Sequence, residues 1–201
     1  MKFKPRSLET RNFIIETTAG LFNAKGYAGT SMSDITNATK LTKGSIYGNF
    51  ENKDEVALAV FDYNLSLVTS RMTERIKAAK TNKEKLMVYV TIYSSPESNI
   101  IFKSGGCPLL NTGIEADDTN EQLRKRVEKG VLGWEKMIIS IINDGMAAKE
   151  FRKGIDASQA ALSIIALIQG GVFIAKATKN SNHLDTVMKT VQSFIEGFEL
   201  K

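Results

Sequence analysis

Apolar residues recur three or four positions apart along nearly the whole chain, and this spacing places side chains on one face of an α-helix. The pattern predicts a first helix from about Leu8 to Lys25, which ends at Gly26 and whose buried stripe is Ile14, Ile15, Leu21 and Phe22. Only three prolines interrupt the pattern: Pro5, Pro96 and Pro108. We therefore predict an all-α protein of about nine helices.

Capping residues mark where the other helices begin. They are Ser31 with Asp34, Thr42, Asn52, Thr119 with Gln122, and Asp156. With the apolar spacing they predict helices over about 32–39, 43–50, 53–79, 83–93, 107–114, 120–145, 157–179 and 184–198. Residues 94–106 are expected to be mostly loop.

The segment 27–53 has the form of a helix-turn-helix whose second helix is short, polar and basic. Gly44 costs that helix about 1 kcal/mol relative to alanine, which makes sense if another surface must come close. Lys53 begins the next helix, where backbone amides and an ammonium can hold a phosphate together. Plain helical hairpins have similar turns, so the geometry alone does not distinguish them from a DNA-binding module. The types of residue favour DNA binding. Short donors, a cation and an aromatic hydroxyl suit phosphates and base edges: Thr42, Lys43, Ser45, Tyr47 and Asn49.

The net charge of +5 is concentrated in the same part of the chain. Residues 1–53 hold eight basic and four acidic side chains, whereas the other 148 residues hold 19 and 18. A solvated basic tail would show the same excess. Combined with the helix-turn-helix, the excess favours a surface that binds phosphates.

Composition argues against several classes of protein. The stretch 160–175 is shorter than the roughly 18 to 20 apolar residues of a membrane span, and we expect Gly170-Gly171 to break it. The basic N-terminus lacks an apolar signal core, so a cytoplasmic protein without membrane contact is expected. One cysteine, Cys107, and one histidine, His183, make neither a disulfide nor a four-ligand zinc site. We expect no metal and no cofactor.

Residues 8–55 resemble the N-terminal domain of the TetR family of transcriptional regulators. The helix order of the rest is similar to the family's ligand-binding and dimerisation domain. The resemblance implies a DNA-binding domain over 1–53 and a ligand-binding and dimerisation domain over 54–201. The matching pieces are Ile14-Ile15, Leu21-Phe22, Gly26-Tyr27, Thr30-Ser31-Met32, Asp34-Ile35, Thr42-Lys43-Gly44-Ser45-Ile46-Tyr47, Phe50 and Lys53.

The resemblance also implies the contacts with DNA, with Tyr47 and Lys53 on phosphates. Lys40 stands where the family usually has glycine, so we expect a left-handed backbone there at a cost of about 1 kcal/mol. Asn49 replaces a common histidine but can still donate a hydrogen bond to phosphate. The predicted DNA-binding residues are Thr30, Ser31, Thr42, Lys43, Gly44, Ser45, Tyr47, Asn49 and Lys53. Ile46 and Phe50 are expected in the core.

One such module contacts few base pairs, so specificity requires a second module about 34 to 36 Å away on a palindromic operator. Residues 160–172 form an almost wholly apolar helix, and residues 187–198 carry a wide apolar stripe. Either could be intramolecular core. The similarity to the family's four-helix dimer interface favours a homodimer, in which Gly170-Gly171 would permit close helix approach or line a cavity.

We interpret the chain as a repressor, not an enzyme, that an unidentified small molecule releases from DNA by shifting the fourth helix. An alternative is a thiol switch, because Cys107 at a helix start could sense electrophiles or oxidants, although most free cysteines only pack. A remote alternative is a helical-bundle enzyme with Cys107 as nucleophile, for which no base is evident. The candidate ligand-binding residues are Phe102, Cys107, Leu110, Asn111, Trp134, Met137, Ile138 and Phe173.

Overall fold

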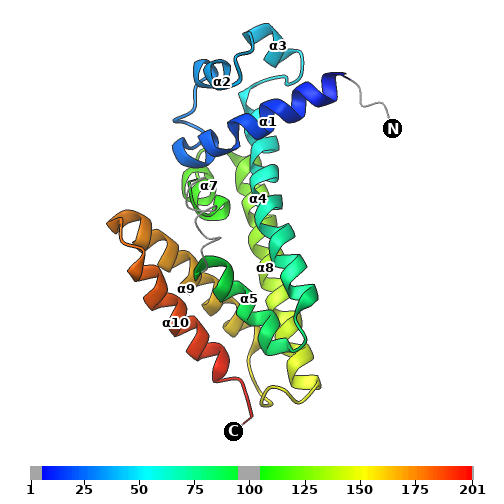
Figure 1. The fold of residues 1–201 in the computed structure, drawn as a ribbon, viewed down its shortest axis with the longest axis vertical. Helices are drawn as coiled ribbons and strands as arrows, with labels where there is room; N and C mark the ends of the chain where they lie inside the picture. The colour runs from blue at the N-terminus through cyan, green and yellow to red at the C-terminus, as the bar shows by residue number, and fades with distance from the viewer. Residues whose placement is uncertain (1–5, 95–104, 201) are drawn as a thin grey trace. The chain divides into compact units, whose positions relative to one another are not determined.

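The computed structural model describes residues 6–94 and 105–200; this part consists of helices joined by turns and loops, with one isolated bridge between Phe151 and Glu199. The all-α prediction is confirmed (Figure 1). Each predicted helix begins and ends within three residues of the bounds expected from the sequence. The helices of the described residues are α1 Arg6–Lys25, α2 Met32–Thr39, α3 Lys43–Tyr47, α4 Lys53–Ala78, α5 Asn82–Ser94, α7 Pro108–Ala116, α8 Glu121–Ala147, α9 Ala157–Thr178 and α10 Asn182–Glu196.

The chain forms two compact units. The first comprises residues 1–67 and 102–127, and the second comprises 68–101 and 128–201. Both α4 and α8 begin in the first unit and end in the second. The first unit thus contains α7 in addition to the helix-turn-helix, so it is larger than the segment that ends at Lys53. The division of functions after residue 53 stays a prediction.

An apolar core holds the N-terminal helices together. α1 contributes Ile14 and Phe22, α2 contributes Ile35, and α3 contributes Ile46; Phe50 follows α3 and is also buried. Each such side chain contributes roughly 1.5–3 kcal/mol when it leaves water. A five-residue helix such as α3 is unstable alone, so this packing holds it in place.

Local capping fixes where α2 and α3 begin. The Ser31 hydroxyl accepts a hydrogen bond from the Asp34 amide at 3.1 Å, and the Asp34 carboxylate accepts one from the Ser31 amide at 2.8 Å, so the predicted capping box is present. The Thr42 hydroxyl accepts from the Ser45 amide at 3.1 Å. Lys40 ends α2 with a φ of 59°, as its place in the turn predicted.

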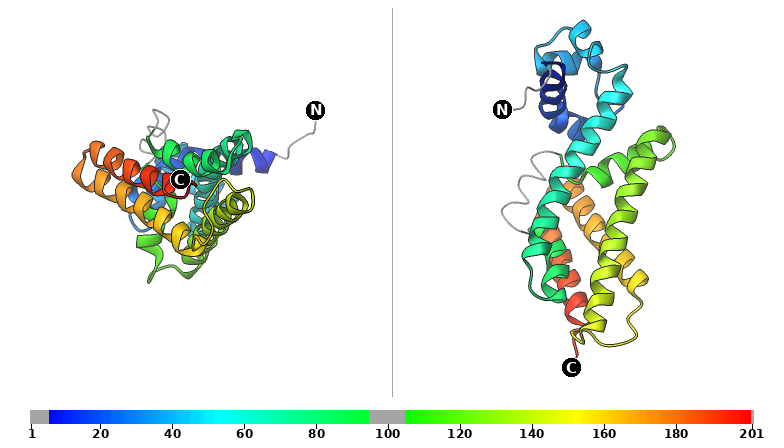
Figure 2. Two further views of the ribbon diagram at one scale, coloured as in Figure 1. Left: turned by 90° about the horizontal axis from the view of Figure 1, so that it is seen from below. Right: turned by 90° about the vertical axis from the view of Figure 1, so that its right-hand side faces the viewer.

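In the second unit, α9 and α10 lie side by side, and α10 also packs on α5 (Figures 1 and 2). Gly171 permits the close approach, because a Cβ there would lie 3.1 Å from the Val187 side chain. Gly170, in contrast, has open space around its Cβ position. The Tyr89 and Trp134 rings meet edge to face with centroids 6.4 Å apart.

The helix α9 corrects one expectation. It continues through Gly170 and Gly171 for 22 residues, so these glycines do not break it. Each costs a helix about 1 kcal/mol relative to alanine, and packing against α10 outweighs that cost. By length and composition, α9 is a candidate membrane span, with a mean hydropathy of 1.8 over an 18-residue window. Apolar core helices have the same composition, and 44% of this window is buried in the fold.

The capping residue of α8 also differs from the prediction. Asn120 caps this helix through its Oδ1, which accepts a hydrogen bond from the Leu123 amide at 3.0 Å. The Thr119 hydroxyl, predicted as the cap, instead donates to the backbone of α7. The helix also continues past Gly145 to Ala147. Thr119 and Asn120 are both suitable capping residues for α8, and the path of the chain after α7 places Asn120 in the capping position.

Candidate nucleic-acid interface

The exposed surface of α3 carries the central residues of the predicted DNA contact. Lys43 is exposed, and Tyr47 leaves 49% of its surface in solvent despite its large ring. Between them, a Cβ at Gly44 would meet only the Thr42 hydroxyl oxygen, at an ordinary 3.9 Å. Nothing within the fold requires a glycine at this position. Its absence of a side chain fits the close approach of another surface.

Three further predicted contacts have structural roles around α3. Thr42 is exposed and caps the helix, and the half-buried Ser45 supplies the amide that this cap binds. The Asn49 side-chain amide donates to the Ser45 carbonyl at 2.9 Å, which closes the last turn of α3. These residues therefore shape the α3 surface whether or not they touch DNA.

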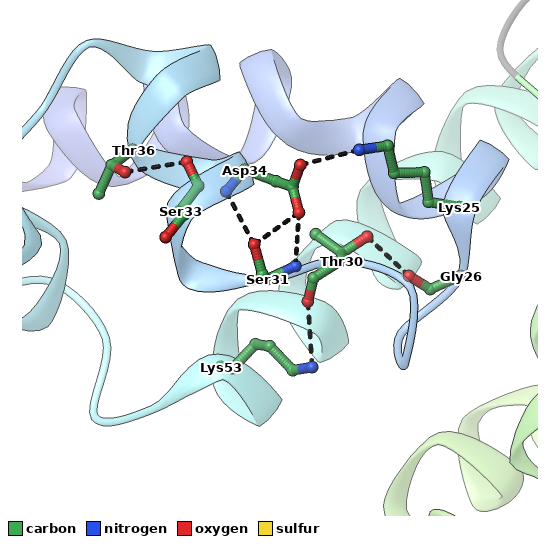
Figure 3. A network of polar contacts seen from close by, with 8 residues as sticks. All are labelled: Lys25, Gly26, Thr30, Ser31, Ser33, Asp34, Thr36 and Lys53. Carbon is green, nitrogen blue, oxygen red and sulfur yellow. Dashed lines mark hydrogen bonds and ion pairs between the residues drawn. The ribbon is translucent and has the colours of Figure 1, made fainter.

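The residues at the start of α2 differ in what they offer. Thr30 is completely buried, and its hydroxyl donates to the Gly26 carbonyl at 2.7 Å (Figure 3). In this conformation it has no side-chain surface to offer DNA. Ser31 is exposed, and its hydroxyl donates to the Asp34 carboxylate at 2.6 Å. Lys25 pairs with that carboxylate at 2.8 Å and, together with Ser31, holds the pKa of Asp34 well below its usual range.

The Lys53 ammonium lies against the turn between α1 and α2. It donates to the Thr30 carbonyl oxygen at 3.1 Å (Figure 3). It also donates to the Tyr27 carbonyl oxygen at 2.9 Å and lies 4.1 Å from the centroid of the Tyr27 ring. An ammonium has three N–H donors, so one remains for a phosphate. The position thus agrees with a phosphate contact and adds a structural role that the sequence did not indicate.

Arg11 on α1 also has a structural role that was not predicted from the sequence. Its guanidinium donates to the Asn49 carbonyl and to the Glu55 carboxylate, the latter at 2.7 Å, and lies 4.0 Å from the centroid of the Phe50 ring. The Glu51 amide and then Arg11 lower the pKa of Glu55. One cation thereby joins the end of α3 to α1 and α4. No local spacing marks it, because Arg11 and Asn49 are 38 residues apart.

Tyr27 is a second residue that sequence reasoning missed. A hydrogen bond from its hydroxyl to the Asp54 carboxylate, with burial as the next cause, raises the pKa of Tyr27 to about 12. The Tyr27 backbone amide donates to the Glu115 carboxylate of α7 at 2.7 Å. Tyr27 therefore links α1, α4 and α7 within the first unit.

The candidate ligand-binding residues fall into both compact units, and Phe102 lies outside the described residues. The first unit holds Cys107, Leu110 and Asn111, and the second holds Trp134, Met137, Ile138 and Phe173. Among the described residues, no group of three or more His, Cys, Asp or Glu side chains could hold a metal ion.

These candidates differ in burial and bonding. Cys107 is only 1% exposed at the N-cap of α7, and its thiol does not cap the helix. The Asn111 amide is half-buried and donates to the Gly105 carbonyl at 2.7 Å. Phe173 is 55% exposed, so its ring is available for contact with another molecule. Trp134 is buried, and its indole N–H has no hydrogen-bond partner among the residues that the structure describes. Leu110 is half-buried, Met137 exposed and Ile138 fully buried.

A pocket lies inside the first unit. Its empty volume is about 310 Å³, a figure that includes open solvent at its mouth. None of the candidate ligand-binding residues that the structure describes lines it. The lining residues are Phe22, Asn23, Tyr27, Ala57, Val60, Phe61, Asn64, Pro108, Thr112 and Leu123.

Comparison with known proteins finds family matches in both the N-terminal and the C-terminal part of the chain. Residues 14–60 match the family described as "Bacterial regulatory proteins, tetR family", and residues 83–191 match "Tetracyclin repressor-like, C-terminal domain". A solved TetR-family transcriptional regulator from Cytophaga hutchinsonii is 50% identical, covers 100% of both chains and superposes with a TM-score of 0.94.

Curated relatives match over nearly the whole chain as well. An uncharacterized HTH-type transcriptional regulator in the lacX 3' region of Lactococcus lactis subsp. lactis is 29% identical over 191 residues, which are 93% of each protein. The HTH-type transcriptional repressor NemR of Escherichia coli strain K12 is 22% identical over 190 residues, which are 93% of this chain and 94% of NemR.

Proposed function

Because the chain belongs to the TetR family of bacterial regulatory proteins, we propose that it represses transcription as a homodimer on a palindromic operator and that a small-molecule effector releases it. The observation that supports operator binding is the exposed face of α3. No contact inside the protein requires a glycine at residue 44, and Lys43 and Tyr47 lie on either side of it. Such a regulator acts where bacterial DNA is, in the cytoplasm, and we assign it no enzymatic role.

An exposed apolar face on α9 supports the homodimer. Leu162, Ala166 and Phe173 lie on one side of the helix by their spacing, and all three are exposed. Gly170 lies next to them with open space at its Cβ position, so a second helix can approach closely. Contiguous apolar surface of this kind marks interaction sites. A second copy of the chain would bury it and set the spacing of the two α3 helices.

Trp134 supports an effector site in the second unit. Buried polar groups are nearly always hydrogen-bonded, yet within 6–94 and 105–200 the indole N–H of Trp134 has no hydrogen-bond partner. The side-chain nitrogen and oxygen of Gln169, on α9, are likewise buried without a hydrogen-bond partner among the described residues. An effector with hydrogen-bonding groups would satisfy such atoms. Because α4 and α8 continue from this unit into the first, a change around Trp134 has a covalent helical route towards the DNA-binding helices.

The first experiment selects duplexes from a random-sequence library with the purified protein. We expect a palindromic sequence to be enriched and bound by a dimer, as measured by fluorescence anisotropy and light scattering. The logarithm of the affinity should fall linearly with the logarithm of the salt concentration, with a slope of about −0.9 per neutralised phosphate. Equal affinity for the selected duplex and a scrambled one would refute specific operator binding.

The second experiment searches for the effector. Trp134 is the only tryptophan, so its fluorescence reports on its surroundings when candidate metabolites are added. A true effector should change that fluorescence and also release the selected duplex. The thiol-switch alternative is tested with Cys107→Ser: if an electrophile releases DNA from the wild type and from the variant alike, the thiol is not the sensor. The burial of Cys107 favours this result.

A further inference from the structure

We propose that Glu115 of α7 is a positioning residue for DNA binding: its carboxylate holds the turn between α1 and α2 in the conformation that presents Lys53 and α2 to DNA. This inference rests on the proposed operator binding, because affinity for DNA is its main readout. It concerns residues that all belong to the first compact unit.

The Glu115 carboxylate binds two successive backbone amides. One oxygen accepts from the Tyr27 N–H at 2.7 Å, and the other accepts from the Ala28 N–H at 2.7 Å. Hydrogen bonds to a charged acceptor are about twice as strong as neutral ones. With both oxygens engaged, the two peptide planes after Gly26 are fixed in orientation as well as in position.

Gly26 makes room for this carboxylate. Its φ is 77°, and a Cβ there would lie 2.4 Å from a Glu115 carboxylate oxygen. Any side chain at residue 26 would therefore collide with Glu115, in addition to the backbone strain. The turn is built to receive the carboxylate closely.

The same turn holds Lys53 through its carbonyl groups. The Tyr27 and Thr30 carbonyl oxygens accept from the Lys53 ammonium at 2.9 and 3.1 Å, and the Tyr27 ring lies beside it. The turn then leads directly into Ser31, which caps α2. Release of the Tyr27 and Ala28 amides would thus displace both acceptors of Lys53 and the start of α2.

α7 is itself anchored on the end of α1. The Asn111 side chain donates to the Asn23 carbonyl at 3.0 Å, and the Asn23 side chain donates to the Gly106 carbonyl at 2.8 Å. Asn111 and Glu115 are four residues apart, so they lie on the same face of α7. A ligand or modification that moves this helix would act on Glu115 and hence on the α1–α2 turn.

Electrostatics and positioning predict opposite effects when Glu115 is neutralised. Removal of a negative charge from a DNA-binding unit strengthens its attraction to phosphates by Coulomb's law. Loss of the carboxylate's hold on the turn weakens binding. Asp117 is a matched control, because it is an exposed carboxylate at the C-cap of the same helix and accepts a hydrogen bond from the adjacent Asp118 amide.

The experiment compares the wild type with Glu115→Gln, Glu115→Asp and Asp117→Asn, with the duplex that the wild type selects as the probe. We expect Glu115→Gln to bind it about tenfold more weakly, as for the loss of one charge-assisted hydrogen bond. Glu115→Asp keeps the charge on a shorter side chain and should be intermediate, while Asp117→Asn should bind at least as tightly as the wild type.

Amide hydrogen exchange provides a readout that does not depend on DNA. The Tyr27 and Ala28 amides should be protected in the wild type and should exchange faster in Glu115→Gln, with exchange in α8 and α9 unchanged. Rapid exchange at both amides in the wild type overturns the proposal even if the variants fail to fold. Wild-type-like DNA affinity of Glu115→Gln also overturns it. If the wild type selects no duplex, the proposed function fails, and the exchange data alone then decide whether Glu115 holds the turn.

Discussion

Substitution of Gly44 by alanine should stabilise the free protein and weaken its binding to DNA. A Cβ at residue 44 would meet only the Thr42 hydroxyl oxygen, at 3.9 Å, so the added methyl group causes no collision inside the protein. Gly44 lies within α3, where alanine is the better helix former. The two effects have opposite signs because one concerns the fold and the other a surface outside it.

The magnitudes follow from the position of the residue. Alanine gains about 0.5–1 kcal/mol over glycine inside a helix, and the lower end applies to the short, first-turn location in α3. For a chain of this length, this raises the melting temperature by about 1–2 °C. A methyl group inserted where two surfaces touch costs about 1–3 kcal/mol, which raises the dissociation constant by roughly five- to 160-fold.

The assay measures melting temperature and DNA affinity on the same preparations, with Gly133→Ala as the control. Gly133 lies in the interior of the long helix α8, is exposed and has nothing within 4 Å of its Cβ position, so alanine there should stabilise the protein at least as much as at residue 44. It is far from α3 in sequence and lies in the other compact unit, so its DNA affinity should not change. If Gly44→Ala binds DNA as tightly as Gly133→Ala does, close approach to residue 44 is refuted.

Three other substitutions test separate features. Phe173→Glu places a charge on the exposed face of α9 and should give monomers by light scattering, whereas Leu132→Glu, at an equally exposed site on α8, should not; dimers of both would exclude the α9 face. Arg11→Gln should lower stability by about 1–2 kcal/mol through the lost Glu55 and Phe50 contacts, and an unchanged urea midpoint would show those contacts to be negligible. In the folded protein the pKa of Tyr27 is about 12, above the ordinary value of 10.0 for a tyrosine, so the stabilisation by its protonated hydroxyl is complete below pH 10 and is lost between pH 10 and 12. Tyr27→Phe should lack this alkaline loss in urea unfolding, and identical pH profiles would contradict it.

Features determined within a few residues could be predicted from the sequence. The Ser31 and Asp34 capping box spans three residues, and the left-handed conformation of Lys40 follows from its place in a short turn. The cap of α8 shows the limit of such reasoning, since Thr119 and Asn120 are both good capping residues. The sequence also misled about α9, because a pair of glycines weakens an isolated helix but suits one that packs closely on a neighbour.

Contacts between distant residues could not be predicted, and they include those that position the candidate site. Glu115 and Tyr27 are 88 residues apart, and the Lys53 ammonium bonds to carbonyl groups that every residue possesses. Neither contact leaves a pattern in one sequence. The candidate ligand-binding residues show the same limit, since their apolar spacing could not divide them between two compact units.

Two glycines of the first unit illustrate how structure separates the demands of folding from those of function. Both Gly26 and Gly44 were singled out by sequence, the first as a helix end and the second as an approach point. Gly26 is fully accounted for inside the protein, by its positive φ and by the Glu115 carboxylate that fills the place of its side chain. Gly44 has neither reason, so the cost of keeping a glycine in α3 must be offset by something outside the folded chain. That difference makes the α3 surface, more than any single donor on it, the strongest structural indication of a DNA partner.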